Sequence, residues 1–228
     1  TDNKAKADLD VANPAISAST WWNAGYDGGI WDAAVCDTGI DGSHPALGVD
    51  YAGVFHDQGK LDGFYADIST STDDLQGHGT HCAGIVASTD ATYKGTAYGL
   101  DGLINAKAGW LATDGSGYMY DSDCMKSIDW AILHSGDDAD VISRSFGGNA
   151  GANGDTALCH YMDAVSFDLQ TPVVASAGND GPSDHTVGEP GSAYNVITVG
   201  NVNDQNTVTR SDDVIRDSSS RGPTGDGR

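Results

Sequence analysis

The run DVISRSF at residues 140–146 is followed by a helix-like stretch at 156–170 and by a second apolar run, PVVASA at 172–177. Short apolar runs bounded by Gly and Asn are typical of buried strands. Two strands joined through a helix form a βαβ unit, and such units build a parallel sheet with helices on both faces. This stretch therefore predicts an α/β fold with a mostly parallel sheet.

The same alternation continues on both sides of this unit. The further expected elements are a strand at 31–36 (WDAAVC), a helix at 78–88 (HGTHCAGIVAS), a weaker strand at 103–110, a helix at 121–134 and a strand at 195–202 (NVITVGNV). Together they predict an α/β fold: a single domain with a doubly wound, mostly parallel central sheet and helices on both faces. The polar residues 1–10 predict a weakly anchored lead-in.

The 228 residues carry 33 Asp and Glu against 11 Lys and Arg, a formal net charge of −22. A chain this acidic repels phosphate backbones and anionic lipid, so we expect no nucleic acid and no membrane among its partners. The acidity suits a saline habitat, where salt screens self-repulsion, or it serves solubility alone. The acids are scattered and form no calcium-binding loop motif, which argues against a repeat-type calcium protein.

The four cysteines, Cys36, Cys82, Cys124 and Cys159, have no C-x-x-C spacing, which argues against a zinc cluster. Cys36 and Cys82 lie in apolar stretches typical of buried thiols. Cys124 and Cys159 have polar surroundings and are the better candidates for one disulfide bridge. The count alone leaves the pairing and the redox compartment open.

Polar residues follow three of the expected strands, and sites in parallel sheets gather at the carboxyl ends of the strands. Taken alone, Asp37 is an ordinary turn residue and His78 an ordinary helix-capping residue. A metal ion held by His78 and His81 lacks a nearby third ligand. An aspartic-protease site would need a second Asp-Thr-Gly on an all-β frame, and this chain has one such tripeptide.

Six segments together resemble, in their order along the chain, the motifs of the subtilisin-like serine proteases, or subtilases. They are DTGIDGSHP at 37–45, GHGTHCAG at 77–84, SFGG at 145–148, SAGN at 176–179, EPGSAYNVITVG at 189–200 and SSRGP at 219–223. The resemblance implies a subtilisin-like peptidase domain over residues 21–228, incomplete at its C-terminus, after a lead-in segment at 1–20. The doubly wound sheet of that family agrees with the pattern of strands and helices.

The resemblance implies catalytic roles for three residues. Asp37 would orient the imidazole of His78, and His78 would act as general base and then as general acid toward the leaving amine. Asn179 would donate its side-chain amide to the developing oxyanion.

The resemblance also implies how a substrate would bind. The residues that would pair with the substrate backbone as an added strand are Ser145, Phe146 and Gly147. The residues that would wall the primary specificity pocket are Ser176, Ala177 and Gly178. Asp74 would either face a second substrate pocket and favour basic side chains there, or be a solvated loop residue.

The family's nucleophile segment, Gly-Thr-Ser-Met-Ala, does not occur in these 228 residues. Ser145 and Ser192 belong to other motifs. The expected explanations are a nicked protease whose companion C-terminal fragment carries the Ser, a truncated piece of a longer chain, or a catalytically inactive peptide-binding protein. Without its remaining part the chain should expose apolar surface and fold poorly alone.

The family implies a secreted, extracellular serine endopeptidase that cleaves proteins or peptides through an acyl-enzyme and needs no cofactor for catalysis. Ala46 stands where the family has a calcium-binding Asp, which puts that calcium site in doubt. Carbonyl groups near Gly191, Ala193 and Val196 keep the spacing of a weaker cation site, so a structural calcium ion or another cation stays open. Cys82 is similar to the free thiol of the family's thiol-containing branch.

Overall fold

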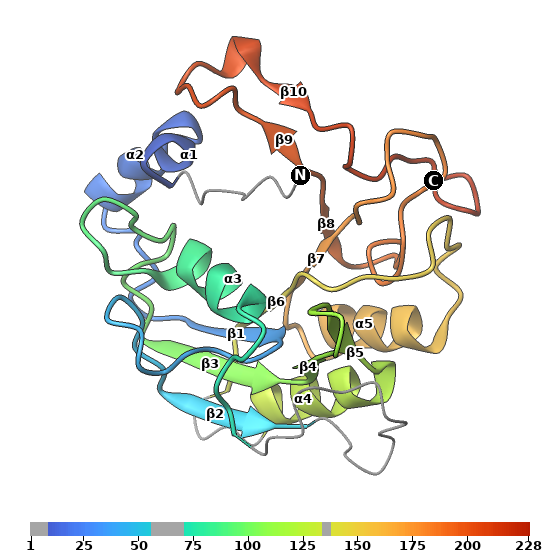
Figure 1. The fold of residues 1–228 in the computed structure, drawn as a ribbon, viewed down its shortest axis with the longest axis horizontal. Helices are drawn as coiled ribbons and strands as arrows, with labels where there is room; N and C mark the ends of the chain where they lie inside the picture. Colours follow the sequence, from blue (N-terminus) through green and yellow to red (C-terminus); the bar gives the residue numbers. More distant parts are fainter. Residues whose placement is uncertain (1–8, 56–70, 134–137) are drawn as a thin grey trace.

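The computed structural model describes residues 9–55, 71–133 and 138–228. Its centre is a six-stranded sheet in the order β2-β3-β1-β6-β7-β8, and every neighbouring pair is parallel (Figure 1). The strands are β1 (Asp32–Asp37), β2 (Tyr51–Val54), β3 (Gly102–Lys107), β6 (Val141–Arg144), β7 (Val173–Ser176) and β8 (Ile197–Val199). The expected α/β fold is confirmed. The strands β2 and β3 lie on one side of β1, and the later strands β6, β7 and β8 lie on the other. The chain thus changes sides between β1 and β6, and sheets of this kind bind ligands at such a switch point.

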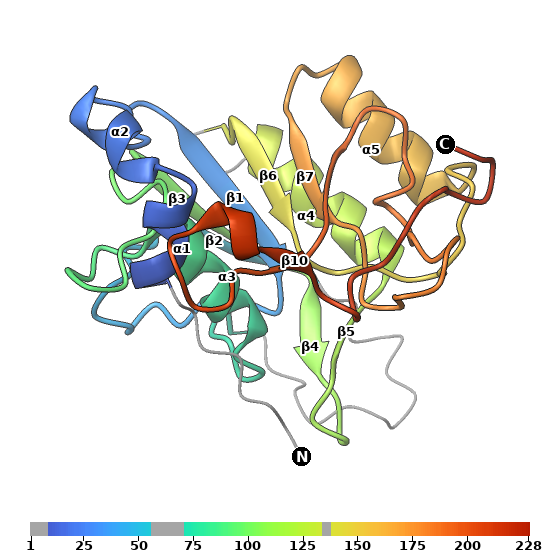
Figure 2. The ribbon, with the colours of Figure 1, turned by 90° about the horizontal axis from the view of Figure 1, so that it is seen from above.

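Helices cover both faces of the sheet (Figure 2). They are α3 (His78–Ala87) on one face and α4 (Asp121–Leu133) and α5 (Ala157–Phe167) on the other. Successive side chains of β1 point to opposite faces, so Val35 packs with Ala83 of α3, whereas Ala34 and Cys36 pack with Ile128 of α4. This alternation gives the protein two apolar cores, one on each side of the sheet.

Smaller elements surround the sheet. They are α1 (Leu9–Ala15), α2 (Ala18–Asn23), the antiparallel pair β4 (Gly109–Leu111) and β5 (Gly117–Met119), the antiparallel pair β9 (Val202–Asn203) and β10 (Val214–Ile215), and the 3-10 helix η2 (Arg210–Asp212). Arg210 ties η2 to the N-terminal helices, since its Nε donates to Ala15 O at 2.6 Å. None of the helices described has the length and apolar character needed to cross a bilayer.

Two expected strands are each divided in the structure. The run at 103–110 breaks at Ala108 into β3 and β4, and the run at 195–202 becomes β8 and β9. Gly109 lets β4 lie close to β5 and to Thr38, because a Cβ there would lie 3.0 Å from Tyr118 O and 3.2 Å from Thr38 Cγ2. The helix expected at 121–134 is α4, and its last expected residue, His134, lies outside the described residues.

The expected Cys124–Cys159 bridge is wrong. All four cysteines are free thiols. Cys124 lies on the buried face of α4 with its Sγ 3.7 Å from Cys36 Sγ, and Cys159 lies on the buried face of α5 with its Sγ 3.6 Å from Ser192 Oγ. Polar flanking residues misled the prediction, because on an amphipathic helix they occupy the opposite face from the cysteine.

The two-sided core predicts a large difference between two isoleucines of the sheet. Ile142 in β6 is fully buried, whereas Ile197 in β8 is 56% exposed. Ile142→Ala should lower the free energy of unfolding by about 2–5 kcal/mol through lost burial and a cavity. Ile197→Ala should cost less than about 1 kcal/mol. Urea denaturation followed by circular dichroism measures both; equal losses would contradict this assignment of the core.

Candidate active site

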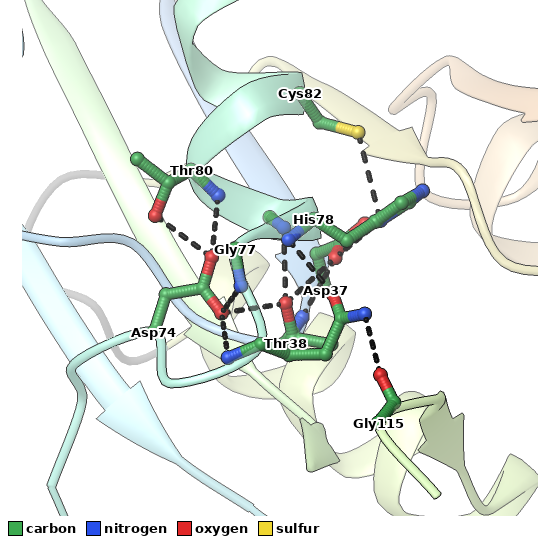
Figure 3. Close-up of polar contacts among 10 residues, drawn as sticks. Asp37, Thr38, Asp74, Gly77, His78, Thr80, Cys82 and Gly115 are labelled. Carbon is green, nitrogen blue, oxygen red and sulfur yellow. Dashed lines mark hydrogen bonds and ion pairs between the residues drawn. The ribbon is translucent and has the colours of Figure 1, made fainter. Parts of the chain in front are cut away.

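An Asp–His pair lies at the carboxyl edge of the sheet (Figure 3). Asp37 is the last residue of β1 and His78 is the first residue of α3. Asp37 Oδ1 lies 2.8 Å from His78 Nδ1, and the side chains are 1% and 40% exposed. The buried carboxylate therefore fixes the ring through Nδ1, and Nε2 is the ring nitrogen left to exchange a proton with a reacting group.

Gly79 allows this close approach. A Cβ at residue 79 would overlap Gly39 O and would lie 3.1 Å from Asp37 Oδ1. Any side chain at this position would push the first turn of α3 away from the end of β1. The glycine after His78 is therefore required by packing between the strand end and the helix.

Asp74 organises the start of α3. Its Oδ1 accepts hydrogen bonds from Thr38 Oγ1 (2.9 Å) and from the backbone N–H of Gly77 (2.8 Å) and Gln76 (3.1 Å). Its Oδ2 accepts from the N–H (2.8 Å) and the hydroxyl (2.7 Å) of Thr80. Both oxygens thus bind the site's own backbone and hydroxyl groups. Asp74 therefore has a structural role at the start of α3. The sequence analysis did not predict this role, and contact of Asp74 with a substrate stays a prediction.

The surroundings of His78 favour its charged form. The hydrogen bond to Asp37 is the largest cause and the one with Cys82 the second, and together they outweigh burial and raise the pKa of His78 to about 10. Burial raises the pKa of the Cys82 thiol, but hydrogen bonds with His78 and His81 outweigh that and hold it below the ordinary value. We therefore expect His78 to gain and lose its proton in the alkaline pH range.

Asp37, His78 and Cys82 could also offer three ligand atoms to a metal ion, all within 4.8 Å of one another. Cys82 Sγ lies 3.8 Å from the same Nδ1 that Asp37 holds at 2.8 Å. A metal ion would have to displace this hydrogen bond from Nδ1. His81, considered from the sequence as a second ligand, is not a member of this group.

Two further strands end at the same edge of the sheet as the Asp–His pair. The segment 145–148 follows β6, and its Phe146 ring meets the His78 ring edge-on at 5.2 Å between centroids. The segment 176–179 ends and follows β7, and Asn179 is exposed there. The sheet thus gathers Asp37, Phe146 and Asn179 at one edge, as the sequence predicted. Their catalytic and substrate-binding roles stay predictions.

The segment at 219–223 supports the end of β7. Gly178 has a φ of +109°, and a Cβ there would lie 2.7 Å from Ser220 Oγ. Ser220 N–H donates to Gly178 O at 3.0 Å, and its Oγ accepts from Asp180 N–H at 3.2 Å. These contacts fix the backbone on both sides of Asn179, at Gly178 and at Asp180.

Arg144 is a site-forming residue that the sequence analysis missed. It is 4% exposed, its Nε donates to Cys124 Sγ at 3.1 Å, and its Nη1 donates to Phe146 O. The pKa of Cys124 is lowered, first by its hydrogen bond with Cys36 and further by Arg144. Arg144 therefore braces the 145–148 segment from within the core. A lone Arg within an apolar strand was the signal for such a buried, hydrogen-bonded charge.

An Asp–His pair whose histidine faces solvent at the carboxyl edge of a doubly wound sheet is the kind of arrangement used in acyl transfer by triad hydrolases. The sequence model of the subtilase family (Peptidase S8) matches residues 33–228. This chain belongs to the subtilase family.

The similarity to curated relatives supports the same family assignment. The chain is 35% identical over 237 residues to the serine protease AprX of Bacillus subtilis (strain 168), covering 98% of this chain and 50% of AprX. It is 33% identical over 205 residues to the minor extracellular protease Vpr of the same strain, covering 88% of this chain and 24% of Vpr. It is 35% identical over 198 residues to a subtilisin of Bacillus pumilus, covering 84% of this chain and 63% of that protein. The chain thus spans about half the length of AprX, a smaller share of the length of Vpr and a larger share of the length of this subtilisin.

The two neighbouring residues Asp73 and Asp74 provide a matched test of the loop before α3. Asp74→Asn replaces an acceptor oxygen by an NH₂ group, so N–H or hydroxyl donors at the start of α3 lose their partner. We expect a loss of about 1–3 kcal/mol in the free energy of unfolding. Asp73→Asn, at an exposed residue, should stay within about 0.5 kcal/mol. Thermal and urea denaturation compare them, and an Asp74→Asn variant as stable as the Asp73→Asn control would refute the structural role.

The pKa of His78 can be tested by proton NMR of its ring between pH 5 and about 11. The signal should titrate near pH 10 in the unaltered chain, because both Asp37 and Cys82 raise that pKa. Cys82→Ser should lower the midpoint, and Asp37→Asn should lower it further because Asp37 is the larger cause. An unchanged midpoint in Cys82→Ser, or a smaller shift in Asp37→Asn than in Cys82→Ser, would contradict this electrostatic account.

Proposed function

We propose that this chain provides most of the active site of a serine endopeptidase that hydrolyses peptide bonds of proteins through an acyl-enzyme. The observation that carries the proposal is the 2.8 Å contact between buried Asp37 and partly exposed His78, within a chain of the subtilase family. The nucleophilic Ser would come from a polypeptide segment outside these 228 residues.

His78 would take the proton of the Ser hydroxyl on Nε2 as the Ser attacks the carbonyl, and would then give it to the leaving amine. Asp37 would hold Nδ1 and stabilise the imidazolium formed between the two steps. The exposed side-chain amide of Asn179 would stabilise the oxyanion. Because the base must start unprotonated and its pKa is about 10, the rate should rise with pH through the alkaline range.

The outer edge of the sheet supports a companion segment. Ile197 and Val199 of β8 are 56% and 51% exposed, and Val202, Val214 and Ile215 of β9 and β10 are also more than half exposed. Apolar clusters of this kind mark surfaces that another polypeptide covers. The segment that carries the Ser would cover this edge.

The alternative is a catalytically inactive fragment or a pseudo-protease that binds peptides without cleaving them. The observation that supports it is the position of the segments 145–148 and 176–179, which lie at the carboxyl ends of β6 and β7, at the same edge of the sheet as the Asp–His pair. Such a protein would keep the substrate strand and lose only the chemical step.

The localisation of the protein is also part of the proposal. The word "extracellular" in the name of Vpr and the net charge of −22 support a secreted enzyme that tolerates high salt. Proteins or peptides would be the substrates. Catalysis would use no cofactor, and a structural cation would bind backbone carbonyls near Gly191, Ala193 and Val196.

Labelling with a biotinylated fluorophosphonate, which reacts with activated serines, tests the proposal. We expect a label on a smaller companion polypeptide, or on a later segment of a longer chain, in protein purified from its natural source. Asp37→Asn should slow labelling by about 10⁴-fold, because His78 loses the carboxylate that orients it. Denaturing mass spectrometry identifies each labelled species. If every species stays unlabelled while peptides still bind, the pseudo-protease is the correct alternative.

A further inference from the structure

Two cysteine sulfurs lie next to each other in the core, between β1 and α4. Cys36 belongs to β1 and directly precedes Asp37, and Cys124 lies near the start of α4. Both residues are fully buried, and the thiol of Cys36 donates to Cys124 Sγ at 3.7 Å. The sulfurs of a disulfide are about 2.0 Å apart, so a small movement of the two side chains would bring them to bonding distance.

Polar groups surround this pair and make it unlike an ordinary buried thiol. Arg144, which is 4% exposed, donates from Nε to Cys124 Sγ at 3.1 Å. Ser127 Oγ lies 2.9 Å from Cys36 Sγ and donates to Cys124 O at 2.8 Å. A neighbouring guanidinium favours the thiolate, and the thiolate is the form of cysteine that attacks an oxidant.

The two thiols differ in acidity. The hydrogen bond from Cys36 and the charge of Arg144 outweigh burial and lower the pKa of Cys124. The hydrogen bond to Cys124 and burial raise the pKa of Cys36. A thiol that ionises readily beside one that stays protonated is the arrangement of a nucleophilic and a resolving cysteine.

A small oxidant has a route toward Cys124. A cavity of about 210 Å³ is lined by Arg144, Phe146 and Leu158, among others. A water molecule takes up about 30 Å³ in the liquid, and hydrogen peroxide has only one oxygen atom more. Because Arg144 lines this cavity and also contacts Cys124 Sγ, a shift of its guanidinium would open the sulfur to a molecule in the cavity.

We propose that Cys36 and Cys124 form a site of reversible oxidation, at which hydrogen peroxide converts the two thiols into a disulfide that links β1 to α4. The proposal rests on the contacts of the two sulfurs and not on the proposed function, since it needs neither a catalytic Ser nor a peptide substrate.

The oxidation takes two steps. The Cys124 thiolate attacks one oxygen of the peroxide, the O–O bond breaks, and the hydroxide released takes up a proton to become water. The sulfenic acid formed on Cys124 is then attacked by the Cys36 sulfur, and its hydroxyl group leaves with the Cys36 proton as a second water molecule. The two thiols thereby lose two electrons and two protons, and one peroxide is reduced to two waters.

Oxidation would change the support of the segment 145–148. Arg144 Nη1 donates to Phe146 O while Nε donates to Cys124 Sγ. A disulfide sulfur carries no charge, so the buried guanidinium loses the anion that holds it. Arg144 would therefore move, and its hydrogen bond to Phe146 O would weaken.

Mass spectrometry of the full-length protein tests the site. Cys82 is first replaced by Ala, because it is partly exposed and would react on its own. The variant is treated with peroxide and then unfolded in N-ethylmaleimide, which alkylates free thiols. We expect two alkyl groups fewer than in the untreated protein, a linked pair of peptides containing Cys36 and Cys124, and full reversal by dithiothreitol.

Cys159 serves as the internal control. It is also fully buried, but its Sγ contacts the Ser192 hydroxyl at 3.6 Å. It should stay open to alkylation after peroxide treatment. The exposure of the native protein to peroxide is set by Cys82 in the unaltered chain, which must be oxidised completely under the conditions used.

Substitutions assign the roles of the groups. In Cys36→Ser, dimedone should trap a sulfenic acid on Cys124, whereas Cys124→Ser should give no such adduct on Cys36. Arg144→Met should slow disulfide formation about 10-fold, because a rise of one unit in the pKa of Cys124 lowers its thiolate fraction by that factor. Arg144→Lys, which keeps the charge, should lose less of the rate.

Hydrogen exchange measures the effect on the segment 145–148. Its backbone amides should exchange about 10-fold faster after oxidation, because the support from Arg144 is weakened. Unchanged exchange in a protein that has formed the disulfide would overturn this coupling and leave the oxidation site standing.

The remaining outcomes overturn the site itself. Two free thiols at Cys36 and Cys124 after Cys82 has been fully oxidised in the unaltered protein would refute it. A link that includes Cys159 would show oxidation of an unfolded chain and refute it as well. Dimedone on Cys36 in place of Cys124 would overturn the assignment of the nucleophile. None of these results depends on substitutions that disturb folding of the core, because the linked peptides are sought in a protein that keeps both cysteines.

Discussion

The contact between the end of β1 and the first turn of α3 is the constraint on which the site depends. Asp37 Oδ1 reaches His78 Nδ1 at 2.8 Å only because Gly79 lets the helix lie against the strand end. Thr38 completes the joint, since its Oγ1 accepts the Gly79 N–H at 2.9 Å and donates to Asp74. The pair is thus held by backbone packing and buried hydrogen bonds, so its geometry does not require a bound substrate.

The central part of the fold was predictable because its signals are local. Strands such as β1, β6 and β7 are short apolar runs closed by polar or small residues, and their alternation with helices dictates a parallel sheet. The strand β2 was missed because Tyr51–Val54 is only partly buried and contains a glycine. The helices α1 and α2 were missed because both are short, and α1 contains Pro14.

The candidate site was predictable only in part. The order of six motifs identified the residues at the sheet edge, but not what holds them. Thr38 and Asp74 are 36 positions apart, and Cys36 and Cys124 are 88 apart. Which polar side chain reaches which partner over such distances is decided by tertiary packing, which leaves no local pattern in the sequence. The same reason explains why the disulfide prediction for Cys124 failed.

Under the proposed function, the residues that would set selectivity and the nucleophile that would set the rate lie on different segments. Phe146 and Gly148 are held by β6, by Arg144 and by the bridge between Gly148 and Glu189, all within the described residues. A nucleophile supplied from elsewhere would add the chemical step, since triads that lose their Ser still retain oxyanion stabilisation and binding. Recognition of a peptide would then be a property of this chain, whichever polypeptide contributes the Ser.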